Sequence, residues 1–196
     1  MKKPRRGWLK IILYGISFVL VIGLGILGYH HIVPTTSYSH ALVMAYDDLN
    51  DMEDHAELIV QVSVAGKGRN EVRKDLEGEG RSHYTYTPLK IDKVYKGDVR
   101  QGSTIELVEP VGYERLPEGL FFIGYLGYTP IQKKSSYLLF LEKVDSGAYA
   151  ICGLYQGKFV WPPPQELTPE KLEVDSFGGH YQKLFEEVVA KYAGLD

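Results

Sequence analysis

Residues 23–28 carry a glycine spacing that proteins use to hold a dinucleotide. They read GLGILG, which matches G-x-G-x-x-G. That fingerprint works at a turn from a strand into a helix, where the backbone approaches the pyrophosphate and the N–H groups of the helix bind it. Here Pro34 would stop a helix that began after Gly28. We therefore interpret the match as an accident of an apolar segment, and we expect no nucleotide or other cofactor.

The remaining polar residues show no recognised catalytic spacing. Residues 53–57 (EDHAE) crowd carboxylates around an imidazole, but they lack the H-E-x-x-H spacing that brings two imidazoles to one zinc ion. The sequence contains no G-x-S-x-G elbow, S-x-x-K pair or P-loop. It therefore predicts no metal site and no catalytic residue. The alternative is an envelope hydrolase whose pair of carboxylates forms only in the fold.

Tyrosine is the most unusual part of the composition, with 15 among 196 residues. Tyr113, Tyr125 and Tyr128 lie in or beside a stretch bracketed by prolines and glycines, and we expect residues 110–130 to present them on a loop. Aromatic side chains give a large contact area for little lost rotamer freedom. These three tyrosines are the candidate partner-binding residues. The alternative is that tyrosine simply suits half-buried strands.

An uncharged segment dominates the N-terminal part of the chain. Residues 11–29 read IILYGISFVLVIGLGILGY, and 12 of these 19 are Leu, Ile, Val or Phe. At about 1.5 Å per residue, a helix of this length extends roughly 28 Å, close to the ~30 Å hydrocarbon core of a bilayer. The sequence therefore predicts a transmembrane signal-anchor helix over residues 11–29, with the lipid bilayer as its partner.

The charges on either side of this segment predict its orientation. Five basic residues precede it, and the next charged residue is Asp47. By the positive-inside rule, residues 1–10 form a cytoplasmic tail and the chain after Tyr29 lies outside. A cleaved signal peptide is the alternative, but its apolar region is usually about 7–15 residues long and is followed closely by a small-x-small site. We expect an uncleaved, single-pass protein of the cell membrane with an extracytoplasmic C-terminal domain.

The composition of the exported part limits its partners. Residues 47–196 contain 17 Lys and Arg against 25 Asp and Glu, a net charge of −8. An acidic domain of this kind argues against nucleic acid as a partner. Cys152 is the only cysteine, so no internal disulfide forms, and we expect it to be a small buried apolar residue. The oligomeric state stays open.

Alternating apolar residues predict a series of strands after a polar stalk at residues 30–40. In residues 57–64 (ELIVQVSV), one face carries Leu58, Val60, Val62 and Val64. Further strands are expected at residues 83–98, 103–109, 120–128, 136–144, 148–154 and 158–161. Residues 66–82 carry mixed charge and four glycines, which predicts a loop or a ragged hairpin. The inward phase slips between Ile91 and Val94, so we expect a β-bulge at residues 92–93.

Helices flank the predicted strands. Residues 41–56 have helical apolar spacing and open the domain at residues 41–196. Residues 177–193 form a C-terminal amphipathic helix. Its apolar stripe consists of Phe177, Tyr181, Leu184, Phe185, Val188 and Tyr192. The predicted fold is mainly β with flanking helices: an N-terminal transmembrane helix, a small OB-like antiparallel barrel and a C-terminal helix.

The order of these strands resembles a group of bacterial cell-envelope proteins. In that group an N-terminal signal or anchor precedes a domain similar to the OB-like barrel of netrin and metalloproteinase-inhibitor modules. The resemblance covers residues 56–161, and its most specific parts are the KGD-x-x-x-G turn and the YLLFL strand. Inhibitor modules rely on disulfides and an N-terminal cysteine, which this chain lacks. The resemblance therefore implies fold and envelope location but no inhibitory residues.

Together these features predict a non-enzymatic, membrane-anchored binding module whose partner is an envelope protein or glycan. An accessory subunit, whose apolar segment contacts another membrane protein, is a further hypothesis. The hydrolase alternative would require carboxylates that converge in a pocket.

Overall fold

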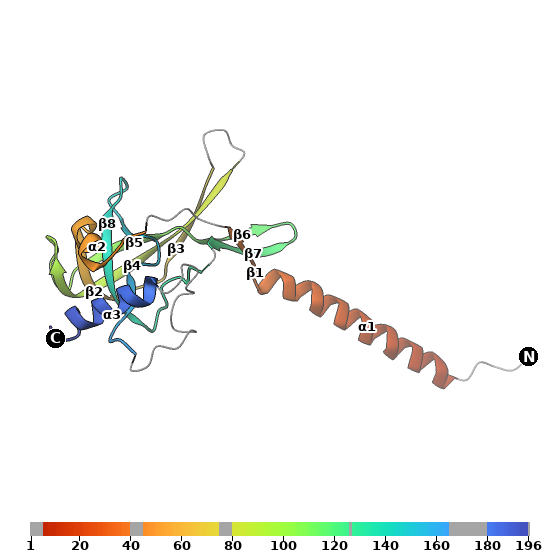
Figure 1. Ribbon diagram of the computed structural model, residues 1–196. Helices are drawn as coiled ribbons and strands as arrows, with labels where there is room; N and C mark the ends of the chain where they lie inside the picture. Colours follow the sequence, from red (N-terminus) through yellow and green to blue (C-terminus); the bar gives the residue numbers. More distant parts are fainter. Residues whose placement is uncertain (1–5, 40–44, 75–79, 126, 165–179, 196) are drawn as a thin grey trace, which may run out of the picture. The chain divides into compact units, whose positions relative to one another are not determined.

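The computed structural model describes residues 6–39, 45–74, 80–125, 127–164 and 180–195, and the chain divides into two units (Figure 1). One unit takes the N-terminal segment up to Ser37 together with Tyr113–Phe122. The other takes Tyr38–Gly112 and the chain from Ile123 onward. The second unit contains the barrel.

Helix α1 (Arg6–Ile32) runs without a break through the glycine fingerprint. Because residues 23–28 lie inside this helix, they do not form the strand-to-helix turn that a dinucleotide site requires. The apolar side chains within residues 10–26 of α1 are exposed; Ile11 and Phe18, for example, are each 67% exposed. Among the described residues, no helix is both long and apolar enough to span a membrane. The structure thus confirms an N-terminal helix, and it does not supply the transmembrane span expected over residues 11–29.

A small sheet combines the strand predicted at residues 120–128 with parts of the predicted stalk and loop. Strands β1 (Thr35–Ser39), β6 (Gly112–Leu116) and β7 (Gly119–Tyr125) pair in the order β1-β7-β6. Part of the stalk is therefore a strand, for which its threonines and tyrosine are suited. Most of the loop predicted at residues 110–130 is a hairpin, because Pro117 and Glu118 form a two-residue turn between its strands.

Five strands close a barrel in the other unit. The larger sheet runs β10 (Lys158–Val160), β8 (Ser136–Lys143), β2 (Leu58–Val64), β4 (Arg81–Lys96), β5 (Thr104–Glu109) and β9 (Tyr149–Ile151). Strand β9 also pairs with β8, which completes the ring of β8, β2, β4, β5 and β9. Nearly all these pairs are antiparallel, but β9 joins β5 in parallel at Leu107 and Tyr149. The mainly β prediction with a barrel is confirmed.

The barrel core follows the predicted alternation. Val60, Val62 and Leu89 are fully buried, as are Ile91 and Leu107. Strand β3 (Arg69–Lys74) extends the sheet by pairing with β4, so the described part of residues 66–82 contains one arm of a hairpin. The predicted bulge is present: Gln61 pairs with Lys93 and Val62 with Ile91, which leaves Asp92 as the extra residue. A second register shift leaves Tyr95 unmatched in the same way, and such bulges bend a strand.

Helix α2 (Leu49–His55) begins later than predicted. Asp48 caps it, since its side chain accepts a hydrogen bond from the backbone N–H of Asp51 at 2.9 Å. A capping carboxylate satisfies a donor of the first turn and so marks where the helix starts. Residues 41–44 of the predicted helix lie outside the described residues.

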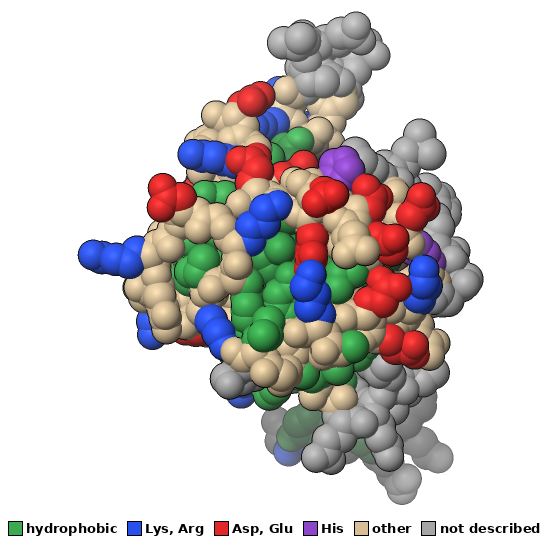
Figure 2. Space-filling view, turned by 60° about the vertical axis from the view of Figure 1, so that its left-hand side comes forward, with side chains coloured by type: hydrophobic (Ala, Val, Ile, Leu, Met, Phe, Trp, Pro, Cys, Tyr) green, Lys and Arg blue, Asp and Glu red, His purple; other side chains and the backbone are tan. Residues whose placement is uncertain are grey.

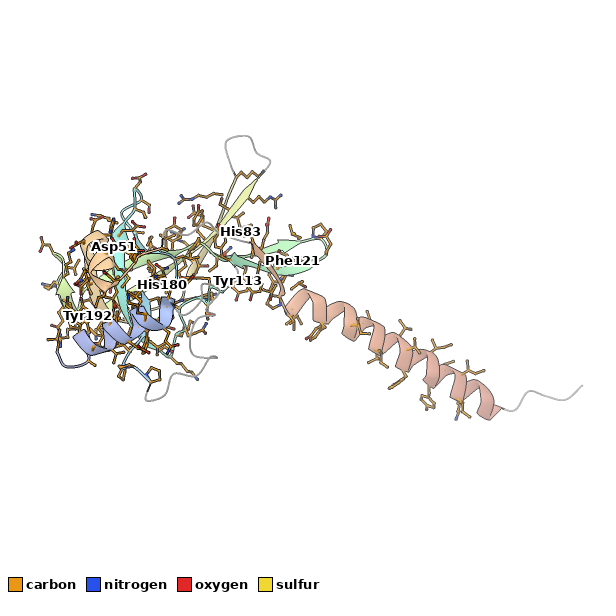
Figure 3. All side chains as sticks on the ribbon, in the orientation of Figure 1. Asp51, His83, Tyr113, Phe121, His180 and Tyr192 are labelled. Atoms are coloured by element: carbon orange, nitrogen blue, oxygen red, sulfur yellow. The ribbon has the colours of Figure 1, made fainter. Side chains whose placement is uncertain are left out.

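Helix α3 (His180–Tyr192) packs on the barrel through its predicted stripe. Tyr181, Leu184 and Phe185 are buried, and so are Val188 and Tyr192; Phe177 lies outside the described residues. The Phe185 ring lies 6.0 Å from Phe159 of β10, and the Tyr192 ring lies 5.7 Å from Phe140 of β8. Figure 3 labels Tyr192 on α3. These contacts place α3 against strands β8 and β10.

Candidate functional site

A pocket of about 330 Å³ lies beside the strand that closes the barrel. This volume is at the lower end of the range for small-molecule sites, about 300–1,000 Å³. The lining combines residues of β4, β5, β8 and β9 with residues of the adjoining loops. They are Tyr46, Tyr84, Val108, Pro110, Tyr128, Glu142, Val144, Ala150, Ile151, Gly153 and Leu154.

The apolar wall of the pocket is part of a small cluster on the barrel. Tyr84, Val144 and Ala150 pack against a buried group that contains Tyr86 and Val108. The β4–β5 register explains this proximity, since Tyr86 stands opposite Val108 and Tyr84 is two residues along the same face. Guanidinium groups of β3 lie over the rings of this cluster: Arg69 is 4.3 Å from the Tyr86 ring centroid, and Arg73 is 5.2 Å from that of Tyr84.

Tyr46 enters the pocket from the segment before α2. Its ring is 2% exposed, and its backbone N–H donates to the Gln156 side chain at 3.0 Å. Its carbonyl oxygen contacts Nε2 of His180 at the start of α3. Burial, followed by the nearby Cys152 and Glu142, raises the pKa of Tyr46 above its ordinary value. Tyr46 is therefore a fixed, neutral wall of the site.

Tyr128 forms another wall and is held from two sides. Its hydroxyl donates to Oε1 of buried Glu109 at 2.6 Å. The Lys158 ammonium lies 4.2 Å from its ring centroid and donates to the carbonyl of Thr129. Glu109 also accepts from the backbone N–H of Ile131 at 2.9 Å. A buried carboxylate and a buried ammonium thus fix the loop that carries Tyr128.

Glu142 is the charged residue in the pocket lining. It is exposed, and in the described part of the chain it takes part in no ion pair. Burial, and then the charge of Glu142, raises the pKa of the neighbouring Cys152 thiol to about 12. The charge of Glu57 also raises the pKa of this thiol, and the charge of Asp51 raises the pKa of Tyr46. Carboxylates therefore lie near this end of the pocket.

Leu154 lines the pocket in an unusual backbone conformation. Its φ is 62°, and among the described residues no other non-glycine residue has a positive φ. The left-handed region is disfavoured for a branched side chain, and such residues cluster at functional sites. The turn that carries it is anchored by Gly157, whose N–H donates to the Cys152 carbonyl at 2.9 Å.

The three predicted tyrosines do not form one exposed surface. Tyr113 lies on β6, is 48% exposed and packs 5.2 Å from the Phe122 ring (Figure 3). Tyr125 ends β7 and is half-buried. Tyr128 is only 4% exposed, so the expectation that a loop presents it on the surface is corrected: burial and the Glu109 hydrogen bond place it in the domain interior, in the wall of the pocket.

The acidic run at residues 53–57 is part of a contact between helices. Glu53 accepts from Lys191 and from the Tyr192 hydroxyl, each at 2.6 Å, and so joins α2 to α3. His55 instead bonds the Asp51 carbonyl within α2. Within the described residues, no group of three or more His, Cys, Asp and Glu side chains is placed to hold a metal ion.

Sequence reasoning missed Tyr46, Tyr84 and Glu142 as site residues. They come from three separate segments, and no spacing along the chain connects them. Glu142 alone carried a signal, as a carboxylate directly after the apolar YLLFL strand. The pocket contains this one carboxylate, whereas the hydrolase alternative needs two that face a common substrate.

Comparison of the chain with protein-family models gives no match, and comparison with curated proteins gives none either.

Proposed function

We propose that the protein is a membrane-anchored, extracytoplasmic binding module of the cell envelope, and that its barrel recognises a partner through the pocket beside β9. The observation that carries the proposal is the lining of that pocket. Three tyrosines form apolar walls around a single carboxylate, which is the composition of a recognition site.

The strand order supports an OB-like barrel as part of this proposal. When β2, β4, β5, β8 and β9 are numbered one to five, the closed order is 1-2-3-5-4. OB-folds bind their ligands on strands two and three and on the loop between strands four and five. In this chain Tyr84 and Val108 lie on those strands, and Val144 begins that loop. This support is an analogy of fold and does not identify a ligand.

Anchoring rests on the sequence and on the exposure of α1. The uncharged run at residues 11–29 follows five basic residues, and its apolar side chains face outward in the structure, with Tyr14 74% exposed. Apolar side chains exposed around a whole helix are stable in lipid or against another protein. Since no helix of the described residues qualifies as a span, fractionation must test this part of the proposal.

A crosslinking pull-down from intact cells tests the function. Ala150→Phe fills the pocket, whereas Ser146→Phe places the same ring on the exposed turn between β8 and β9 and serves as the control. We expect Ala150→Phe to lose the crosslinked partner and Ser146→Phe to retain it. Both variants should unfold at similar denaturant concentrations.

Two other outcomes would contradict the pocket assignment. If Ala150→Phe is folded and keeps every crosslink, the partner binds elsewhere, and separate changes of Tyr113 and Tyr125 to serine then test each of these remaining candidate residues. If crosslinks form only through α1, the accessory-subunit hypothesis replaces the binding module.

A further inference from the structure

We propose that the pocket binds an organic cation, an ammonium or guanidinium group on a short apolar body, presented by the partner of the binding module. This inference rests on the proposed function and adds the chemical class of the ligand. It depends on three properties of the pocket: its aromatic walls, its charge and its few free hydrogen-bonding groups.

The aromatic walls are suited to a cation. Tyrosine faces carry negative electrostatic potential, and they attract ammonium and guanidinium groups within about 6 Å. The protein already uses the same rings in this way: the Lys158 ammonium lies 4.2 Å from Tyr128, and the Arg73 guanidinium lies 5.2 Å from Tyr84. A ligand cation would use ring surface that faces the pocket.

The charge of the lining gives the sign of the ligand. Glu142 is its charged member, and in the described part of the chain it has no basic partner. Arg73 and Lys158, the cations that lie over lining tyrosines, are engaged elsewhere. Arg73 pairs with Glu71 at 2.7 Å, and Lys158 donates to the Thr129 carbonyl on the loop fixed by buried Glu109. A cationic ligand would therefore supply the positively charged partner that Glu142 lacks, whereas an anion would be repelled.

The free hydrogen-bonding groups of the pocket are too few for a neutral sugar. The polar side-chain groups of the lining are the hydroxyls of Tyr46, Tyr84 and Tyr128 and the carboxylate of Glu142, and the Tyr128 hydroxyl is already used by Glu109. A sugar ring needs several placed polar partners to replace its water. An alkylammonium ion needs one carboxylate and aromatic faces, which this pocket has. Both acidic and basic side chains border the hydrophobic area on the face drawn in Figure 2, whereas the net charge of −8 over residues 47–196 favours a basic partner.

Ligand-observed NMR with the purified full-length chain tests this inference. The probes are butylammonium and butylguanidinium ions, with butanol as the neutral analogue, butanoate as the anion and N-acetylglucosamine as the sugar. We expect the two cations to bind at least about tenfold more tightly than butanol, and butanoate and the sugar to give no saturation transfer. Higher salt should weaken the cations and leave butanol unchanged.

Two carboxylate variants separate a site from general charge attraction. Glu142→Gln removes the pocket carboxylate and should reduce cation affinity about tenfold without changing the affinity for butanol. Glu186→Gln removes an exposed carboxylate of α3 and should change neither affinity. Both residues are exposed, so both variants should remain folded.

Each remaining result contradicts the inference. Equal affinity for butanol and butylammonium, an unchanged cation affinity in Glu142→Gln, or a preference for butanoate or the sugar would each overturn it. The proposed function fails separately. If Ala150→Phe loses the crosslinked partner while the NMR shows no preference for cations, the binding module stands and its ligand class is wrong. If cations bind but crosslinks survive in Ala150→Phe, the ligand class stands, and the proposal that the partner binds through this pocket is wrong.

Discussion

At the scale of single residues, the buried polar groups around Tyr128 explain how a loop becomes a pocket wall. Glu109 is 1% exposed and Lys158 is 3% exposed, which is costly unless each has partners. The Tyr128 side chain contacts both, through its hydroxyl and through its ring. Removing one member of such a network leaves the others buried and less well satisfied.

Tyr128→Phe is therefore expected to destabilise the protein by about 1–3 kcal/mol, because Glu109 loses a hydrogen-bond donor and keeps only the Ile131 N–H among its described donors. Denaturant unfolding of the purified chain measures this change. Tyr113→Phe is the matched control: that side chain is 48% exposed, and its change should stay within about 0.5 kcal/mol. Equal stabilities of the two variants would contradict the structural role of Tyr128.

The Cys152 thiol gives a prediction about alkaline pH. Its folded pKa is about 12 against an ordinary value of 9.0, mainly because of burial. The folded protein thus holds a proton that the unfolded chain releases. The contribution of this thiol to the free energy of unfolding is therefore fully present below pH 9 and is lost as pH rises towards 12. We expect Cys152→Ala to lessen the decline just above pH 9, measured by denaturant unfolding at stepped pH. The native thiol should also resist a maleimide at pH 8 until the protein is unfolded. Rapid labelling of the folded protein would show that the thiol is accessible.

At the scale of secondary-structure elements, α3 explains why strands of the barrel are buried on both faces. Ile59 points away from the barrel core, yet it is 2% exposed. It stands opposite Phe140 in the β2–β8 register, and Phe140 contacts Tyr192 of α3. The helix therefore provides the second layer that covers β8 and its neighbours.

Leu184→Ala should cost about 2–5 kcal/mol, since Leu184 is 1% exposed within this layer. Gln182→Ala is the control on the exposed side of the same helix and should have an effect of less than about 0.5 kcal/mol. Urea unfolding of both variants distinguishes a docked helix from an independent one. Two equal values would mean that α3 does not contribute to the folded core.

At the scale of the whole molecule, the proposed topology predicts where each end of the chain lies. A reporter fused after Asp196 should be active only outside the cytoplasm, and the full chain should fractionate with membranes at its unprocessed mass. Replacement of Lys2, Lys3, Arg5 and Arg6 by neutral residues should lower the fraction in this orientation, because these residues supply most of the cytoplasmic charge bias. A shortened product released from the cells would contradict uncleaved anchoring.

The sequence by itself determined the parts of the fold that depend on local patterns. Alternation predicted β2, the slip between Ile91 and Val94 predicted the bulge at Asp92, and helical periodicity predicted the buried stripe of α3. Each is a relation among near neighbours that a repeat of two or 3.6 residues makes visible. The same local reasoning explained why GLGILG is no nucleotide site.

Only the tertiary structure decided the site and the irregular segments. The strand at β7 was expected, but β1 and β6 depend on pairing with it, which their short polar sequences do not predict. Burial of Tyr128 depends on Glu109 and Lys158, which lie 19 and 30 residues away. The pocket joins Tyr46, Tyr84 and Glu142 because closure of the barrel by β9 brings their segments together. Contacts between residues so far apart leave no periodic pattern in the sequence, and for that reason the sequence did not predict them.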